Sequence, residues 1–205
     1  MIHLAFGGAS IDGGLYTWVT DLARRAPHAL NTLVGYWTDY GLFVFAALVV
    51  LAWWRARRAD ATRMAMALAA PFAVVLAYVA NVVVKDLVDE RRPCRTLHTL
   101  TVQVCPGPGD WSFPSNHSAI AAAAAVTLLL VHRRLGVLAA VGALLMAASR
   151  VWVGAHYPHD VLVGLVLGAL VAWPLTRLAR RAAPAVTRLR SGRAGALLAV
   201  VGSRG

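Results

Sequence analysis

The sequence predicts an all-α protein: a polytopic membrane helix bundle of about five transmembrane helices with an N-terminal interfacial amphipathic helix. Composition is the first observation, because 59% of the 205 residues are hydrophobic and 14% are charged, whereas soluble domains are about a quarter charged. The second is a series of five apolar runs. The third is that arginines stand between those runs and in the tail, where topology signals belong. Together they predict one membrane domain without sequence repeats.

Residues 1–40 are expected to form an N-terminal interfacial region. Apolar residues recur at helical spacing over Leu15–Trp37, while Asp21 and Arg24 fall on the other face. This pattern predicts an amphipathic helix in the membrane interface, bent at Pro27. A helix packed on the bundle is an equal alternative. The first residues lack the basic-then-apolar order of a cleaved signal peptide.

Residues 41–180 are expected to form the transmembrane core, and residues 181–205 a basic cytoplasmic tail. The second apolar run has no charge over 21 residues and is a full span. The last three runs are shorter than the roughly 20 residues that a span needs. Polar flanking residues are therefore expected at membrane depth, where they usually mark function. The runs are Tyr36–Trp54, Met64–Val84, Ser118–Val131, Leu135–Ala148 and Val161–Thr176.

Basic segments follow the first, third and fifth runs: "RARRADATR", "HRR" and "RLARRAAPAVTRLRSGR". An alternating five-span topology places all three on one side, which the positive-inside rule makes cytoplasmic. The sequence thus predicts a multi-pass plasma-membrane protein with a cytoplasmic C-terminus. The loop 88–113 and the turn 151–159 then face outward. Because the arginines follow this topology, the net charge of +11 does not indicate nucleic-acid binding.

Polar residues from three distant segments meet on the predicted outer face. One segment is "KDLVDERRP" at the end of the second run, another is "PSNH" before the third, and the last is "SRVWVGAHYPHD" between the fourth and fifth. Three such segments at one depth and on one side predict a shared site. Its candidate residues are Lys85, Arg92, Ser115, Asn116, His117, Arg150, His156 and Asp160.

The cations and a helix start predict a phosphate ligand. Lys85, Arg92 and Arg150 supply positive charge, and the arginine fork suits phosphate oxygens. Ser115 and Asn116 open a helix whose free N–H groups and dipole also favour an anion.

The remaining groups suit catalysis. Asp160 stands four residues after His156 and can accept a hydrogen bond from one ring nitrogen, leaving the other free to attack. His117 can protonate a leaving oxygen. No metal or cofactor is expected, because the surrounding cations would repel a divalent ion. Only structural or headgroup contacts are expected for His98, His132 and His159.

The patterns "K-x6-R-P", "P-S-N-H" and "S-R-x5-H-x3-D" resemble the three signature motifs of the type 2 phosphatidic acid phosphatase superfamily. That superfamily also contains soluble acid phosphatases and vanadium haloperoxidases, but this chain resembles its membrane branch. The resemblance implies a phosphohistidine mechanism with His156 as the nucleophile, Asp160 as its orienting residue and His117 as the general acid. One departure is Asn116, where the commonest motif has glycine. Since that position would contribute mainly its backbone N–H, a side chain there is tolerable.

The leading expectation is an outward-facing membrane lipid phosphatase, with undecaprenyl diphosphate as the preferred substrate and undecaprenyl phosphate as product. The alternatives are a phosphatidate or phosphatidylglycerol phosphate phosphatase, a phosphotransferase of the same fold, and a non-catalytic lipid-binding membrane protein. The expected partners are a lipid phosphate and the bilayer, without nucleic acid. The sequence sets no oligomeric state.

Cys94 and Cys105 lie in the predicted outward loop with ten residues between them. We predict that they form a disulfide, because that side of the membrane is oxidising. Closing a loop of this size contributes roughly 3 kcal/mol in the entropic model. Two free thiols are the alternative.

Overall fold

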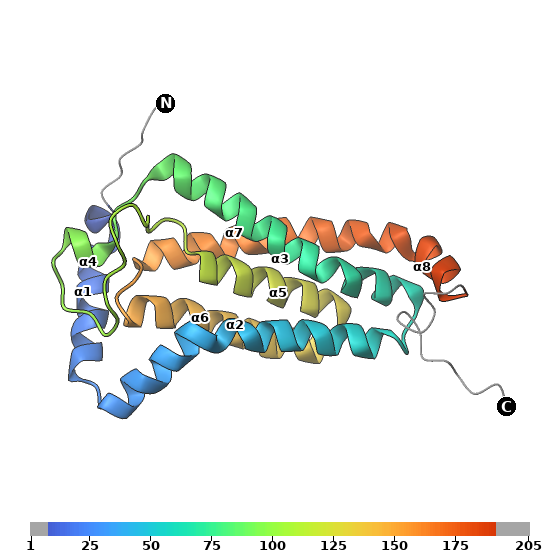
Figure 1. Cartoon of the computed structure of the whole chain (residues 1–205), viewed down its shortest axis with the longest axis horizontal. Helices are drawn as coiled ribbons and strands as arrows, with labels where there is room; N and C mark the ends of the chain where they lie inside the picture. Colours follow the sequence, from blue (N-terminus) through green and yellow to red (C-terminus); the bar gives the residue numbers. More distant parts are fainter. Residues whose placement is uncertain (1–7, 192–205) are drawn as a thin grey trace.

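The structure is a computed structural model that describes residues 8–191, and Figure 1 shows its helices. The described residues form eight α-helices and one short 3₁₀ turn, η1. Expectations about the first seven residues and about residues 192–205 of the basic tail lie outside the described residues. The elements are α1 (Ala9–Arg25), α2 (His28–Ala56), α3 (Ala61–Val88), α4 (Pro93–Thr96), α5 (Asn116–Val131), α6 (Arg133–Trp152), α7 (Pro158–Ala179), η1 (Arg180–Ala182) and α8 (Ala183–Arg190).

The long helices lie side by side along one axis, with α1 and α4 at one end of the bundle and α8 at the other (Figure 1). Four helices of the described chain are long and apolar enough to cross a membrane, and they begin at His28, Ala61, Arg133 and Pro158. The chain is therefore an all-α, multi-pass membrane protein. Four of the roughly five expected spans are thus found in the described chain.

The remaining expected span, the run Ser118–Val131, forms the short helix α5. Its 16 residues extend about 24 Å at 1.5 Å per residue, less than the roughly 30 Å of a hydrocarbon core. Its run Ala121–Ala125 is buried, and it packs against α3, α6 and α7. After its last turn, His132 Nε2 lies 3.4 Å from Arg55 Nη1 near the end of α2. The helix α5 therefore runs from the end that carries Ser115 toward the end that carries Arg55. The other helices surround it along this path.

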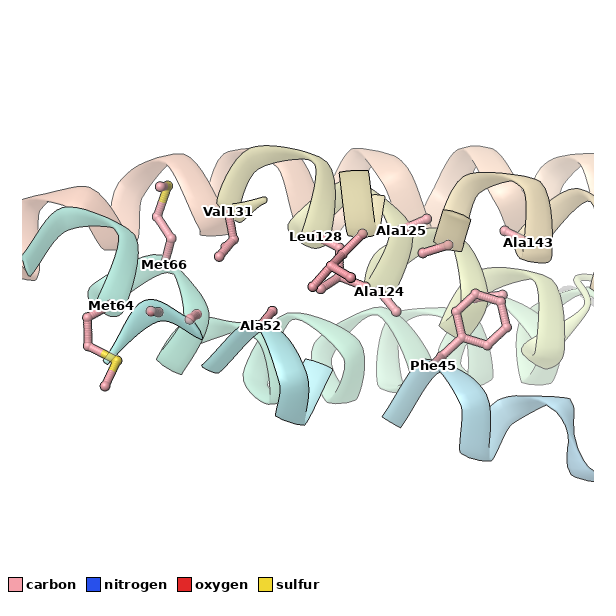
Figure 2. Close-up of a cluster of buried hydrophobic side chains, with 14 of the residues drawn as sticks. Phe45, Ala52, Met64, Met66, Ala124, Ala125, Leu128, Val131 and Ala143 are labelled. Atoms are coloured by element: carbon pink, nitrogen blue, oxygen red, sulfur yellow. The ribbon is translucent and has the colours of Figure 1, made fainter. Parts of the chain in front are cut away.

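Small residues allow this close packing. Figure 2 shows the main core, in which Phe45, Met64 and Leu128 lie among buried alanines. Alanine and glycine let helix backbones approach each other in membranes, where packing rather than water exclusion drives association. A Cβ built on Gly164 of α7 would lie 2.6 Å from Ser115 O at the start of α5. The starts of α5 and α7 are therefore in contact.

The expected helix over Leu15–Trp37 is two helices. Proline disfavours a helical conformation in the preceding residue, and Ala26 is extended with ψ 153°. Asn31 Nδ2 donates to Ala23 O at 2.8 Å across the break. Residues 28–37 consequently belong to the first long span rather than to the N-terminal helix.

The basic segments gather at the end of the bundle that carries α8. Arg190 donates to Ala59 O at 2.9 Å and to Ala56 O at 3.0 Å, so the last described helix packs on the α2–α3 turn. Arg180 Nε lies 3.3 Å from Met66 Sδ. This common end agrees with the predicted topology. Its assignment to the cytoplasm stays a prediction.

The opposite end carries the connection between α3 and α5. Cys94 and Cys105 form a disulfide in it, with Cα atoms 6.0 Å apart. Arg95 Nε donates to Pro106 O at 2.8 Å beside this bridge. Formation of the disulfide in the cell stays a prediction.

We expect Gly164→Ala to lower the Tm of the detergent-solubilised protein, because the new Cβ would press on Ser115 O. Overpacking of this kind costs about 1–3 kcal/mol. Gly35→Ala in α2 is the matched control, since a Cβ there meets no heavy atom within 4 Å. Equal changes in Tm for the two variants would contradict the close packing of α5 and α7.

Candidate active site

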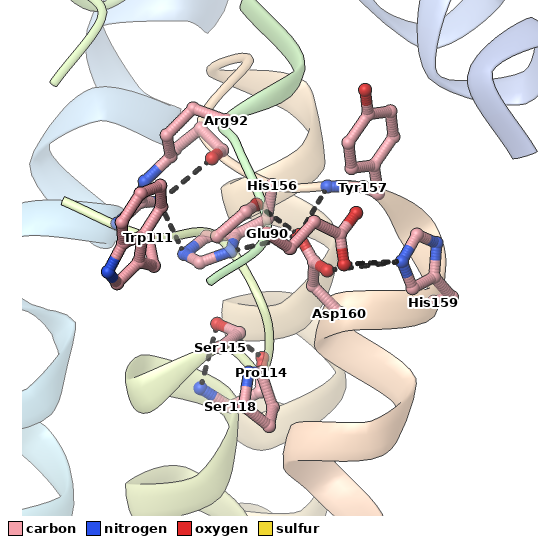
Figure 3. Close-up of polar contacts among 12 residues, drawn as sticks. Glu90, Arg92, Trp111, Pro114, Ser115, Ser118, His156, Tyr157, His159 and Asp160 are labelled. Carbon is pink, nitrogen blue, oxygen red and sulfur yellow. Dashed lines mark hydrogen bonds and ion pairs between the residues drawn. The ribbon is translucent and has the colours of Figure 1, made fainter. Parts of the chain in front are cut away.

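The predicted site residues converge at the bundle end that carries α1 and α4, as Figure 3 shows for several of them. They come from the last turns of α3 and α6, the loop before α5, the first turns of α5 and α7, and the turn between α6 and α7. Most of them are buried: Lys85, Arg92, Ser115, Arg150, His156 and Asp160. Asn116 and His117 are half-buried.

His156 has a defined ring orientation. Its Nε2 lies 2.9 Å from Arg92 Nη1, and its Nδ1 lies 3.3 Å from Asp160 Oδ2. A guanidinium can only donate hydrogen bonds, so Nε2 must be the acceptor. The proton is therefore on Nδ1, where the carboxylate accepts it. The lone pair of Nε2 points toward the cations.

Asp160 is the acceptor around which this turn folds. Its Oδ2 accepts hydrogen bonds from Ser112 Oγ and, at 2.8 Å, from Tyr157 N. Tyr157 is the N-cap of α7 and Pro158 occupies the first helical position, where proline is favoured. The carboxylate thus caps its own helix while it orients His156.

The turn before His156 depends on Gly154, whose φ is +86°. A side chain would be strained there, and a Cβ would also overlap Thr101. Tyr16 of α1 donates its hydroxyl to Gly154 O at 3.0 Å. Arg150 O accepts the backbone N–H of His156 at 3.2 Å. These contacts fix the backbone that carries the imidazole.

Two of the predicted cations also hold the loop before α5. Lys85 Nζ donates to Trp111 O at 2.8 Å and to Ser112 O at 3.1 Å. Arg92 Nη2 pairs with Asp110 Oδ1 at 2.8 Å, and its Nε donates to Asp110 O at 3.1 Å. The segment 110–112 is therefore fastened to the site by the same charges that suit a phosphate.

Arg150 retains donor capacity. Its Nη1 donates to Thr38 Oγ1 at 3.0 Å, but its buried Nε has no hydrogen-bond partner within residues 8–191. Buried donors are nearly always paired. An anionic ligand would supply the missing acceptor.

The surrounding charge keeps His156 neutral. Burial comes first, and the positive charges of Arg92, Arg150 and Lys85 act in the same direction; together they hold the pKa of His156 well below its usual value of 6.5. Both causes disfavour the protonated ring. A neutral imidazole whose unprotonated Nε2 carries a lone pair is a competent nucleophile.

The first turn of α5 is arranged by polar side chains. Ser115 is its N-cap, and its Oγ accepts from Ser118 Oγ at 3.2 Å. Asn116 Oδ1 accepts from Asn81 Nδ2 at 2.6 Å, and the same Nδ2 reaches Pro114 O at 3.0 Å. The Asn116 side chain is thus held by α3. This contact explains how asparagine is accommodated where glycine is commonest.

His117 lies within the same electrostatic cluster. It interacts with Arg150, Arg92 and Lys85, and also with His156. The structure therefore brings the two histidines and the three cations together. The chemical roles assigned to them stay predictions.

Sequence reasoning missed several contributors. Asn81 stands four residues before Lys85, and a polar residue in an otherwise apolar run was an available signal. Thr38 in the first span offered the same signal. Ser112 and Glu90 lie in the loop after α3 without a comparable pattern.

His159 makes structural contacts, as expected for it, and its partners are three acidic side chains. Its Nε2 lies 3.3 Å from Asp160 Oδ1 and 3.2 Å from Glu90 Oε2. Donor atoms of these three residues lie within 4.8 Å of one another, a spacing at which a metal could bind. Both ring nitrogens of His159 face carboxylates, however, because Nδ1 lies 2.8 Å from Asp12 Oδ1. The arrangement is that of a hydrogen-bonded ion cluster.

Comparisons with known proteins show what the chain is similar to. Residues 66–184 match the family model described as the PAP2 superfamily. Undecaprenyl-diphosphatase BcrC of Bacillus subtilis is 32% identical over 146 residues, which cover 70% of this chain and 72% of the relative. An undecaprenyl-diphosphatase of Sulfolobus acidocaldarius is 32% identical over 148 residues, covering 70% of this chain and 68% of the relative.

A solved structure shares the fold. The crystal structure of Aquifex aeolicus LpxE matches with a TM-score of 0.64 at 21% identity, covering 86% of this chain and 99% of that one. At this level of identity the similarity concerns the fold alone.

We expect NMR of ¹⁵N-histidine-labelled protein to show His156 neutral, with its proton on Nδ1, at pH 6.5 and below. Arg92→Met should raise the pKa of His156, because it removes a positive charge that disfavours the protonated ring. Arg91→Met is the matched control, since Arg91 is exposed. Protonation of His156 at or above pH 6.5 in the unaltered protein would contradict the assigned electrostatics.

Proposed function

The chain belongs to the PAP2 superfamily and is a membrane lipid phosphatase, and on this premise we propose that it hydrolyses undecaprenyl diphosphate to undecaprenyl phosphate through a phosphohistidine. The observation that carries the mechanism is the orientation of His156. Its protonated Nδ1 faces Asp160, and its Nε2 faces Arg92. The two relatives named undecaprenyl-diphosphatase support the substrate.

In the first step, Nε2 of His156 attacks the terminal phosphorus. The bond between this phosphorus and the bridging oxygen breaks, and the electron pair leaves with undecaprenyl phosphate. His117 donates a proton to the leaving oxygen as general acid. Asp160 stabilises the positive charge on the ring of the resulting phosphohistidine.

In the second step, His117 acts as a base. It accepts a proton from water, whose oxygen attacks the phosphorus and breaks the P–N bond. Inorganic phosphate leaves, and Nε2 of His156 again carries its lone pair. The histidines finish in their starting protonation states. The proposed steps use only these side chains and water, without a metal or cofactor.

The phosphate group would be bound by Lys85, Arg92 and Arg150. The unpartnered Nε of Arg150 and the N-terminus of α5 suit its oxygens. Phosphoryl transfer depends mainly on such positioned charge. Ser115 and Asn116 would contribute chiefly by shaping this helix start.

An apolar groove could accommodate the lipid tail of the proposed substrate. The groove lies between α2 and α6 and has a volume of about 360 Å³. Ser149 in its wall donates to Thr38 Oγ1 at 3.1 Å, the same hydroxyl that accepts from Arg150. The groove therefore adjoins the proposed phosphate site. Its other lining residues are Leu33, Val34, Trp37, Leu145, Ala148 and Trp152.

The site would face the extracytoplasmic side, because the basic segments gather at the other end of the bundle. A carrier diphosphate released on that side would reach the phosphate site while its tail stays in the bilayer. Phosphatidate, phosphatidylglycerol phosphate and transfer to another acceptor are the competing reactions.

We expect the purified full chain, assayed with a chelator, to release phosphate from undecaprenyl diphosphate faster than from phosphatidate. Phosphate release in detergent micelles at matched lipid concentrations measures both. Faster turnover of phosphatidate would overturn the substrate assignment. Loss of activity in chelator would overturn the metal-free mechanism.

A second prediction separates the two histidines. His156→Ala should abolish turnover and the acid-labile phosphoenzyme alike. His117→Ala should slow an ester with a poor leaving group by about 10²–10⁴-fold, as expected for one lost general acid. It should slow p-nitrophenyl phosphate much less, because that leaving group needs little protonation.

His28→Ala is the control for these variants, since His28 is exposed on α2. Equal losses on both substrates for His117→Ala would contradict its role. A trapped phosphohistidine in His156→Ala would show that another residue is the nucleophile.

A further inference from the structure

A partly buried cluster lies directly behind Asp160, outside the contacts used in the proposed reaction. His159 is at its centre, with Asp12 of α1 on one side, Glu90 of the loop after α3 on another, and Asp160 on a third. Glu90 is 1% exposed and Asp160 is fully buried. Figure 3 shows His159 directed at the Glu90 and Asp160 carboxylates.

The contacts define the charge of His159. Its Nδ1 lies 2.8 Å from Asp12 Oδ1, and its Nε2 lies 3.2 Å from Glu90 Oε2. An ionised carboxylate offers only acceptors, and a ring nitrogen donates only when it carries a proton. With both carboxylates ionised, both ring nitrogens must donate, which is the imidazolium form. The cation then offsets part of the negative charge of three neighbouring acids.

The imidazolium also faces the free oxygen of Asp160. Oδ2 of this carboxylate is engaged by Ser112, Tyr157 and His156. Oδ1 is buried without a hydrogen-bond partner within the described chain, and His159 Nε2 lies 3.3 Å from it. A nearby positive charge favours the ionised carboxylate, and it opposes the burial and the negative charge of Glu90, which disfavour that form.

We infer that His159, clamped by Asp12 and Glu90, is a positioning residue that keeps Asp160 ionised so that Asp160 can orient His156 and stabilise the phosphohistidine. This inference rests on the proposed function. Neither His159 nor its acidic partners would touch the substrate. Their loss should therefore slow the chemical step without weakening phosphate binding.

Helix α1 supplies Asp12, one of the two acids that hold His159. Asp12 accepts the backbone N–H of His159 at 2.7 Å through its second oxygen, so it also caps the first turn of α7. Gly8 leaves room for Glu90, because a Cβ there would overlap its carboxylate. Tyr16, one turn further along α1, holds the backbone before His156. The helix expected to lie at the interface thus carries part of the catalytic support.

The pH dependence follows from the same contacts. The titratable groups that face His159 are Asp12 from α1, Glu90 from the loop, and Asp160 and the stacked ring of Tyr157 from the start of α7. At a pH where His159 is protonated, the clamp is intact. As the pH rises and His159 loses its proton, the unaltered enzyme should approach the activity of a neutral variant.

The test compares the full-length enzyme with His159→Gln, which removes the cation. The value of kcat should fall about 10- to 100-fold, the range typical of residues that orient a functional group from behind, while KM stays within about threefold. The ratio of unaltered to variant kcat should shrink as the pH rises. Titration of Lys85 or His117 cancels in this ratio, because both proteins contain them.

Asp12→Asn gives a milder probe that retains the side-chain shape. Asp21→Asn is its matched control, since Asp21 lies on the same helix with its side chain 47% exposed. Asp12→Asn should lower kcat and Asp21→Asn should not. The double variant Asp12→Asn/His159→Gln should lose no more than His159→Gln alone, because Asp12 acts through His159.

A readout independent of turnover separates this inference from the proposed function. NMR of ¹⁵N-labelled histidine should show His159 protonated on both nitrogens at neutral pH in the unaltered protein. A neutral His159, an unchanged kcat in His159→Gln, or a ratio that does not vary with pH would overturn the inference. Absence of phosphate release by the unaltered enzyme would instead overturn the proposed function and leave the NMR result standing.

Discussion

The carboxylate of Asp160 is the constraint on which the active end of the bundle depends. It is fully buried, and a buried charge without partners costs several kcal/mol. Its partners come from the loop before α5 through Ser112, from the N-cap of α7 through Tyr157, and from the turn through His156. Satisfying one carboxylate therefore fixes two backbone segments relative to each other: the loop before α5 and the turn that leads into α7. The same requirement explains why the site assembles from parts distant in sequence.

His156 lies on the boundary between two oppositely charged halves. Behind it are Asp160 and the acids around His159, and on the other side are Arg92 and the remaining cations. This separation of charge decides the tautomer: the proton faces the acids and the lone pair faces the cations. It also leaves the cationic half under mutual repulsion, which carbonyl oxygens and Asp110 offset in part. A phosphate anion would offset the remaining positive charge of the cations. Its phosphorus would lie where it can accept the lone pair of His156 Nε2.

Motif spacing predicted the convergence of the cations and histidines, because charged residues at membrane depth are costly and need a common purpose. The all-α bundle followed from apolar runs of sufficient length. The short helix α5 was harder to predict, since its apolar run is too brief for a full span and its neighbours include α3 and α7, which are separated from it in sequence. The contacts of His159 could not be recognised from sequence, because its partner Asp12 is 147 positions away. Contacts of that range are set by how α1 docks, which no local pattern encodes.

The close packing of α5 and α7 is also a condition for the electrostatics. Ser115 N donates to Asp160 O at 3.1 Å, which joins the first turns of both helices. The N-terminus of a helix carries about half a positive charge, and two such ends in contact repel unless an anion lies between them. Gly164 permits the close approach of the two helices, and the carboxylate of Asp160, in the first turn of α7, offsets the positive charge of their N-termini. The position of α5 thus places a helix dipole beside the cations, so backbone and side chains favour the same charge at one point.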